Sequence, residues 1–485
     1  MSADIRIGNG FFGYSEDTLL GYGAGVNNRV RSVIFDSKRF YTKHVKNKDG
    51  YLENIVQNQP AIDYELNSSG ALRIERAIAT RNKYSEDFTQ SEYFTNGVTP
   101  MTNAAANTAL GVTSPKNNFK VDASGTDKLM KIFKLQNVSG NNSYIQFQDA
   151  AQGQRYVVSC FFKKDNARYV GFEHAYSGNP NKDLAVYDFD SNTFVKEIRN
   201  VLDGDKTIAA KAISYANGWV RLVFNFKSIS STTALIRLKV FQDANGLTTA
   251  INDACFITGF NVSRSNQVTA FFKSYQKCVG ALVTNGQDTL TRVNNTQYML
   301  PKLTANPARG LTWTFKFILN EARQFGKIAL NQTGGGASNK TSIEFETYPI
   351  TDSGSFYGGL GLRIKHNLTS SGVLTGKDFI NPVLNTSSLV SGVEYHVGFT
   401  YTDGFLRFSV NGQDANAFTD GSTPETGATR YIFSPTLDTT STRQINDIRI
   451  AGQNSQINPM PLNLIDMALY DKSSTQSELN FLTLQ

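Results

Sequence analysis

The chain has 485 residues, more than one hydrophobic core usually fills, so we expect several domains. Hydrophobic residues make up 40% and charged residues only 18%, with 33 Phe and 21 Tyr, a mix that favours strands and turns over helices. The formal net charge of +7 is mild for this size and argues against a dedicated nucleic-acid-binding protein, in which a dense basic stripe is expected.

The patterns of cysteine, histidine and apolar residues exclude further classes. Three cysteines (Cys160, Cys255, Cys278) are too few and too scattered for a disulfide framework or a Cys-type zinc site. The N-terminal sequence lacks the apolar run of a signal peptide, and no run approaches the ~18 apolar residues of a membrane span. We expect a protein that is made and folded in a cytoplasm and does not insert into a membrane. Four isolated histidines show no metal-ligand spacing: His44, His174, His366 and His396.

The first 48 residues divide into a glycine-rich part and a basic part. Residues 1–28 have no clear periodicity, and their run Gly21–Gly25 lacks the flanking strand and helix of a phosphate loop, so we expect a flexible or partner-ordered arm. Residues 29–48 carry seven cations against one acid, Asp36, and form either a solvated face or a surface that docks onto an acidic partner protein. These candidate anchoring residues are Arg29, Arg31, Lys38, Arg39, Lys43, Lys46 and Lys48.

A motif follows in three pieces, Asn58–Tyr64, Leu72–Glu75 and Arg81–Phe88. It resembles a pattern of tailed-bacteriophage structural proteins, in which it stands just ahead of a β-sandwich. The chain departs from that pattern at Ala61, where Arg is usual, and at Arg81, where Thr is usual. Physically the stretch has the character of an extended linker, because Pro and Gly interrupt its short apolar pieces.

Residues 89–265 have the pattern of one all-β domain, with alternating strands split by Gly, Asn and Asp turns. Their order resembles the carbohydrate-binding-module-like (CBM-like) jelly roll of phage tail and fibre proteins, with Gly218-Trp219 and Phe189–Phe194 as anchors. The predicted strands are Asn142–Asp149, Arg155–Lys164, Arg168–His174, Leu184–Asp188, Gly218–Lys227, Ala234–Gln242 and Ala254–Ser263.

Residues 266–300 read as a connector with a possible strand at Cys278–Thr284, and a second sandwich follows. Its order resembles the concanavalin A-like (laminin-G-like) fold, in which the last anchor leads into a short terminal helix. Thr475 and Glu478 form a capping box for that helix. The predicted strands are Leu311–Leu319, Ile343–Tyr348, Leu360–Lys365, the hairpin Tyr395–Gly412, Ile448–Ala451 and Leu464–Tyr470.

Catalytic patterns are weak. Glu344 and Glu346 project from one face of a predicted strand but lack the third carboxylate of the E-x-D-x-x-E motif carried by some concanavalin A-like glycosidases. No G-x-S-x-G elbow is present. Laminin-G-like domains often bind calcium through loop acids, and four are available here, yet no D-x-D-x-D cluster appears, so we expect no cofactor. Those acids are Asp352, Asp420, Asp438 and Asp466.

Aromatic residues supply the candidate glycan contacts. Trp313 shares its strand face with Phe315 and Phe317 and belongs to a core. Trp219 lies opposite an apolar face, where it either packs against a loop or connector or stacks on a sugar. The candidate glycan-binding residues are Tyr176, Tyr348 and Tyr357, expected in loops, together with Trp219.

These observations predict an all-β chain of two tandem sandwiches behind an N-terminal arm. The expected role is that of a non-enzymatic virion protein of a tailed phage, a fibre or decoration subunit on head, neck or tail. By analogy we expect a homotrimer that joins other virion proteins through its arm and adheres to host or environmental glycans. The alternative is a glycan-cleaving depolymerase, and a third interpretation, a bacterial surface adhesin, is disfavoured because no secretion signal is present. The expected division is 1–60 anchoring arm, 61–88 linker, 89–265 CBM-like jelly roll, 266–300 connector and 301–485 concanavalin A-like sandwich.

Overall fold

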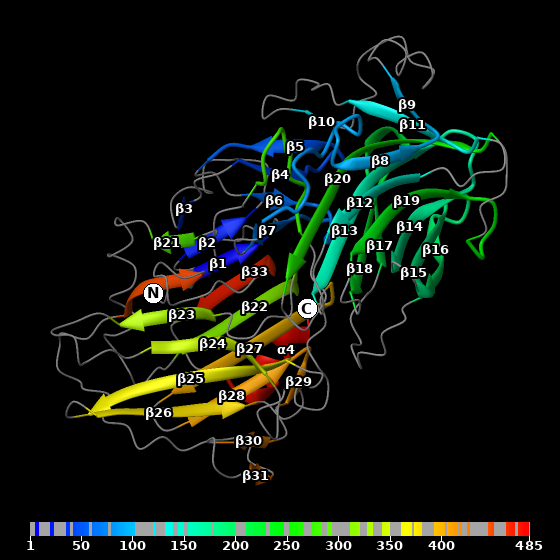
Figure 1. The fold of residues 1–485 in the computed structure, drawn as a ribbon. Helices are drawn as coiled ribbons and strands as arrows, with labels where there is room; N and C mark the ends of the chain where they lie inside the picture. The colour runs from blue at the N-terminus through cyan, green and yellow to red at the C-terminus, as the bar shows by residue number, and fades with distance from the viewer. Residues whose placement is uncertain are drawn as a thin grey trace. The chain divides into compact units, whose positions relative to one another are not determined.

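A computed structural model describes the following parts of the chain, almost entirely as β-strands and turns, and the all-β class is confirmed (Figure 1). The described residues are 5–8, 20–23, 35–38, 42–57, 61–75, 79–101, 120–121, 131–138, 144–149, 154–176, 179–198, 210–228, 233–246, 252–265, 273–283, 289–292, 311–320, 327–332, 342–349, 360–370, 373–380, 392–402, 405–414, 417–419, 424–426, 445–450, 462–470 and 474–484.

The chain forms two units that interleave along the sequence. Unit 1 contains residues 1–40, 57–76 and 287–485, and unit 2 contains residues 41–56 and 77–286. The predicted order was sequential, with an arm and a linker ahead of both sandwiches. In the structure, segments of the predicted arm and linker contribute strands to the units themselves.

Unit 2 is a sandwich of two six-stranded sheets. The alternation in the sequence places Ile145, Phe147, Leu238 and Phe172 between the sheets, in one core of buried side chains. The first sheet has the order β17 (Ala210–Ser214), β18 (Trp219–Lys227), β13 (Arg155–Lys164), β20 (Ala254–Ser265), β11 (Ile132–Gln136) and β9 (Val98–Met101). The second has the order β16 (Thr193–Ile198), β15 (Asn179–Asp188), β14 (Tyr169–Tyr176), β19 (Ala234–Phe241), β12 (Tyr144–Asp149) and β8 (Tyr93–Asn96).

A third layer covers the outer face of the first sheet. Strands β4 (Lys43–Lys46) and β5 (Leu52–Ile55) form a hairpin, and β10 (Lys120–Val121) pairs with β5. Leu52 of this hairpin and Tyr275 join Phe161 and Trp219 in a second buried cluster. The hairpin therefore covers the outer face of the first sheet. It does not cover the outer face of the second sheet.

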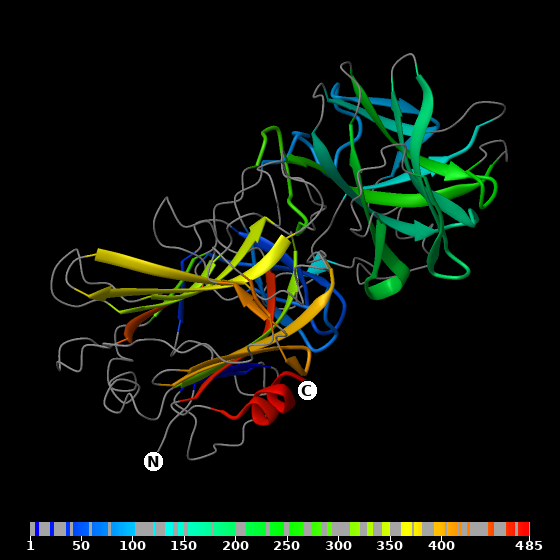
Figure 2. The same ribbon diagram turned by 90° about the horizontal axis from the view of Figure 1, so that it is seen from below.

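Unit 1 contains two larger sheets that face each other (Figure 2). Strand β1 (Ile5–Gly8) pairs with β33 (Leu462–Tyr470), and β3 (Phe35–Lys38) pairs with β21 (Thr289–Arg292), so parts of the predicted arm are strands of this unit. The first sheet contains β2 (Leu20–Gly23), β1 (Ile5–Gly8), β33 (Leu462–Tyr470), β22 (Leu311–Leu319), β27 (Glu394–Thr402), β28 (Phe405–Val410) and β29 (Gln413–Asp414), with β7 (Ala71–Ile74) and β6 (Ile62–Asp63) beside β33. The second contains β3 (Phe35–Lys38), β21 (Thr289–Arg292), β32 (Ile445–Ile450), β23 (Lys327–Gln332), β24 (Ser342–Pro349), β25 (Leu360–Ser370), β26 (Val373–Ile380), β30 (Ala417–Thr419) and β31 (Pro424–Thr426).

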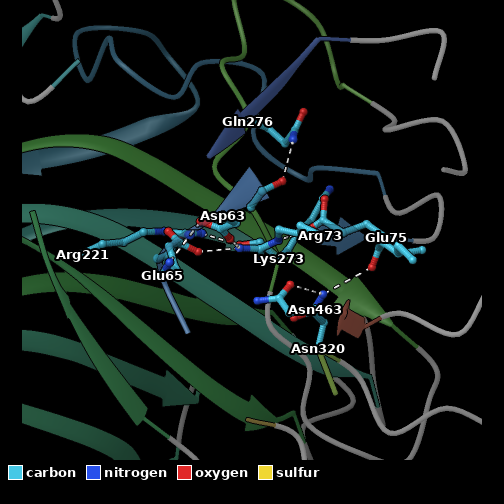
Figure 3. Close-up of polar contacts among 12 residues, drawn as sticks. Asp63, Glu65, Arg73, Glu75, Arg221, Lys273, Gln276, Asn320 and Asn463 are labelled. Atoms are coloured by element: carbon cyan, nitrogen blue, oxygen red, sulfur yellow. Dashed lines mark hydrogen bonds and ion pairs between the residues drawn. The ribbon is translucent and has the colours of Figure 1, made fainter. Parts of the chain in front are cut away.

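A buried ionic cluster fixes the first part of the predicted linker, residues 61–75, in unit 1 (Figure 3). The Nη1 of Arg73 forms ion pairs with Asp63 and, at 2.6 Å, with Glu65, while its Nε lies 2.9 Å from Glu75. All four side chains are at most 5% exposed. Burial raises the pKa of Asp63 although the Arg73 charge opposes the shift. Residues 61–75 of the motif are therefore an internal part of this unit and not an extended linker, whereas Arg81–Phe88 belongs to unit 2.

The terminal helix α4 (Gln476–Leu484) begins as the sequence predicts. The backbone N–H of Thr475 donates to Glu478 Oε2 at 2.7 Å, and the N–H of Glu478 donates to Thr475 Oγ1 at 3.2 Å. This reciprocal pair is the expected capping box. No helix in the described part of the chain has the length and apolar character that a bilayer crossing requires.

Candidate functional site

The predicted aromatic glycan contacts do not form one site. Trp219 is 1% exposed and packs in the buried cluster with Tyr275, so its indole offers no face to a sugar. Tyr176 and Tyr348 were expected in loops, but Tyr176 ends β14 and Tyr348 lies within β24. Nothing more is described of their side chains, and Tyr357 lies outside the described residues.

The predicted anchoring cations are dispersed. Lys43 is fully buried in β4, where the hairpin covers the sheet, so its ammonium cannot dock on a partner surface. Lys46 is half-buried with its Nζ 5.6 Å from the Tyr215 ring centroid, and Lys48 is exposed. Lys38 lies in β3 by its backbone alone, and Arg29, Arg31 and Arg39 lie outside the described residues.

The candidate catalytic and calcium-binding acids likewise do not come together in the described part of the chain. Glu344 and Glu346 occupy β24, with only their backbone described. Asp466 lies in β33 opposite Lys316 of β22. Across the ranges given above, no three His, Cys, Asp or Glu residues are placed to hold a metal ion. The acids Asp352, Asp420 and Asp438 lie outside those ranges.

A different group of residues comes together on the outer face of the second sheet of unit 2. Strand alternation turns Tyr144 and Gln146 outward, because Ile145 and Phe147 point into the core. The register then aligns four residues from four neighbouring strands. Phe94 of β8 lies opposite Gln146 of β12, Gln146 lies opposite Arg237 of β19, and Arg237 lies opposite Glu173 of β14.

Three flat groups stack along this row. The rings of Phe94 and Tyr144 are nearly parallel, with an interplanar angle of 29° and centroids 5.9 Å apart. The guanidinium carbon of Arg237 lies 5.0 Å from the centroid of Tyr144. Phe94 and Arg237 come from the strands on either side of β12, so Tyr144 is held between them. Phe94 nevertheless remains 58% exposed. One aromatic face is therefore fixed in place and still accessible from solvent.

Polar neighbours hold Arg237. Its Nε donates to Gln146 Oε1 at 2.7 Å and its Nη1 donates to Glu173 Oε1 at 2.9 Å. The other oxygen of Glu173 lies 3.3 Å from the Nζ of Lys239. Gln146, Glu173 and Lys239 are almost fully buried, whereas the Arg237 side chain is 24% exposed. The guanidinium is thus oriented before any ligand arrives.

The opposite half of the same face is closed. Leu184, Val186 and Phe241 form a small buried cluster there. The backbone at Gly246 lies so close to Leu184 that an added Cβ would meet its Cδ2 at 2.6 Å. Lys196 ties the same turn down by donating to the carbonyl of Asn245 at 3.2 Å. Within the row, Phe94 and part of the Arg237 guanidinium are exposed, whereas Gln146 and Glu173 are buried beneath them.

This arrangement offers a hydrophobic plane beside directed polar donors and acceptors, which suits ligands with both apolar C–H faces and hydroxyl or acidic groups. The sequence predicted β12 and β19 and the outward alternation of Arg237 and Lys239. It gave no sign of β8, because Tyr93–Asn96 has no clear alternation. It also could not pair β12 with β19, which lie far apart in the sequence.

Comparisons with known proteins add little. No protein-family model matches the chain, and no curated protein matches it significantly. Solved structures with some similarity include the CBM40 domain of the Ruminococcus gnavus IT-sialidase bound to α2,3-sialyllactose (14% identity, 36% of this chain and 83% of that chain, TM-score 0.23). Others are the tailspike protein 2 enzymatically active domain of bacteriophage CBA120 (11%, 36% and 24%, TM-score 0.23) and the Trypanosoma rangeli sialidase (10%, 74% and 53%, TM-score 0.23). At these scores the similarity supports no inference about ligand or activity.

Proposed function

We propose that unit 2 binds glycans on the row formed by Phe94, Gln146, Arg237 and Glu173. The observation that carries this proposal is the exposed ring of Phe94, stacked on Tyr144 beside a fixed guanidinium. Sugar rings present C–H groups on one face and hydroxyls at the edge. A ring lying on Phe94 would keep its hydroxyls within reach of the polar groups that follow along the row.

The proposed role of the whole chain is attachment without bond cleavage, as a fibre or decoration protein of a tailed-phage particle. The support for a phage origin is the resemblance of the motif at residues 58–88 and of the two sandwich patterns. In this proposal the protein is a homotrimer that joins other virion proteins, and no residue of the glycan-binding row acts as an acid, base or nucleophile.

The binding proposal is tested by screening the full chain on a glycan array, followed by titration of the best ligand with a Phe94→Ala variant. Loss of the stacking plane should weaken binding by about tenfold or more, by analogy with nucleic-acid bases, for which stacking on an aromatic side chain contributes about 1–3 kcal/mol. Phe481→Ala is the matched control, because Phe481 is also a well-exposed phenylalanine but lies on α4 of unit 1. Equal weakening in both variants, or in neither, would contradict this site.

Two further measurements address the wider role. Incubation with capsular polysaccharides should leave chain length unchanged, and shortening would favour the depolymerase. Deleting residues 1–60 would remove strands of both units, so substitution of Arg29, Arg31 and Arg39 by Glu is the better anchor test. We expect these substitutions to lower incorporation into particles, and a particle reconstruction would give the position and stoichiometry of the protein.

A further inference from the structure

The guanidinium of Arg237 still has hydrogen-bonding capacity. Arginine has five N–H donors. The bonds from Nε to Gln146 and from Nη1 to Glu173 use two of them, so three, including both donors of Nη2, make no bond to the described part of the chain. No other hydrogen bond joins Arg237 to the described residues, and its side chain is 24% exposed. The guanidinium of Arg237 is therefore accessible to solvent and can donate hydrogen bonds to a ligand.

The orientation of this cation is fixed on three sides. The guanidinium carbon lies over the Tyr144 ring, Gln146 holds the Nε, and Glu173 holds the Nη1. Glu173 is also bonded to Lys239, so it is held in place independently of Arg237. A guanidinium that is already oriented loses little conformational freedom when it binds a ligand, and its planar donors match the two oxygens of a carboxylate.

We propose that the ligand of this row is an acidic glycan, in which a sugar carboxylate accepts hydrogen bonds from Nη2 of Arg237 while a sugar ring lies on Phe94. This inference rests on the glycan-binding function proposed above and adds the chemical class of the ligand. A neutral hydroxyl also accepts from Arg237, but the charge-assisted bond to a carboxylate is roughly twice as strong, and this difference makes the row selective.

The experiment compares polymers that differ only in their carboxylates. Polygalacturonate, alginate, hyaluronate and polysialic acid are titrated into the full chain, each beside its carboxyl-reduced form, with dextran sulfate as a sulfated polyanion. We expect at least one acidic polymer to bind about tenfold or more tightly than its reduced form and more tightly than dextran sulfate. In the Arg237→Gln variant, the acidic polymer and its carboxyl-reduced form should bind with nearly equal affinity.

Two variants separate this geometry from general attraction to a basic protein. Arg237→Lys keeps the charge but loses the planar donors, so most of the preference should disappear. Lys164→Gln removes another exposed cation of unit 2 and should leave the preference intact. Thermal unfolding of each variant checks that its fold is retained.

The possible failures are distinguishable. Tight binding to neutral glycans with no preference for any acidic form would overturn the ligand class and leave the glycan-binding function standing. A preference that survives Arg237→Gln, is lost in Lys164→Gln, or is matched by dextran sulfate would overturn the role of Arg237. Absence of binding to every polymer and to the array would overturn both proposals.

Discussion

The phenolic oxygen of Tyr275 lies 2.9 Å from Oγ of Ser85, and this buried pair joins the segment that leads into the sandwich of unit 2 to the segment that leaves it. The Tyr275 hydroxyl also donates to Glu86 Oε1 at 2.7 Å, and Ser85 Oγ accepts the backbone N–H of Cys278 at 2.9 Å. Burial, together with the Glu86 charge, raises the pKa of Tyr275 well above its ordinary value, so the phenol remains a donor.

Ser85→Ala should destabilise unit 2 by about 1–3 kcal/mol, because it leaves the buried N–H of Cys278 without this acceptor. The two tryptophans make the measurement specific, since Trp219 lies in unit 2 and Trp313 in unit 1. In a Trp313→Phe background, the tryptophan fluorescence followed during urea unfolding comes from Trp219 and therefore reports the unfolding of unit 2 alone. Ser191→Ala, at an exposed turn, is the control and should leave the midpoint unchanged. An equal midpoint for both variants would contradict a structural role for Ser85.

The most accurately predicted strands were those that the apolar pattern of their own sequence identifies without reference to partners elsewhere in the chain. Arg155–Lys164 and Leu311–Leu319 appear with the predicted bounds, because long apolar stretches between turns leave few alternatives. The motif that contains Ser85 was interpreted as an extended linker, because Pro and Gly interrupt its short apolar pieces. Its burial comes from partners such as Tyr275, far along the chain, and a local pattern cannot indicate them.

The candidate site was missed for a related reason. The outward alternation of Arg237 was visible in the sequence, but its partners Gln146 and Glu173 come from strands that are not consecutive in the chain. Sheet order and register bring these residues into one row, and neither follows from a single sequence. Trp219 shows the reverse case, because a residue that could have been exposed lies under a hairpin contributed by the N-terminal region.

Arg73→Met should destabilise unit 1 by about 3–5 kcal/mol, because it leaves the buried carboxylates of Asp63, Glu65 and Glu75 without their shared cation. Asp63→Asn should cost much less, since burial already raises the pKa of Asp63 toward the neutral form. Urea unfolding in a Trp219→Phe background reports unit 1 through Trp313. Similar losses in the two variants would contradict this account of the cluster.

Gly398→Ala should loosen α4 and destabilise unit 1 by about 1–3 kcal/mol. A Cβ at Gly398 would lie 2.7 Å from Thr483 Cγ2 and 2.9 Å from Leu479 Cδ1, so these buried side chains of the helix would have to shift. The same unfolding assay applies. Because Leu479→Ala removes one of the clashing groups, the double variant should lose less stability than the sum of the two single variants. Strict additivity would mean that the two positions do not interact.

His396 should make unit 1 less stable as the pH falls. Burial, assisted by the nearby charge of Lys316, lowers the pKa of His396 from 6.5 to about 4. Between these values the unfolded chain binds a proton that the folded chain does not, so this group's contribution to the free energy of unfolding falls with decreasing pH, by at most about 1.4 kcal/mol per pH unit. His396→Gln should remove this contribution, so the stability difference between wild type and variant changes between pH 6.5 and 4. Lys316→Gln should shift the NMR titration midpoint of His396 upward. A wild-type midpoint near 6.5 would show that the imidazole is solvated and would contradict the prediction.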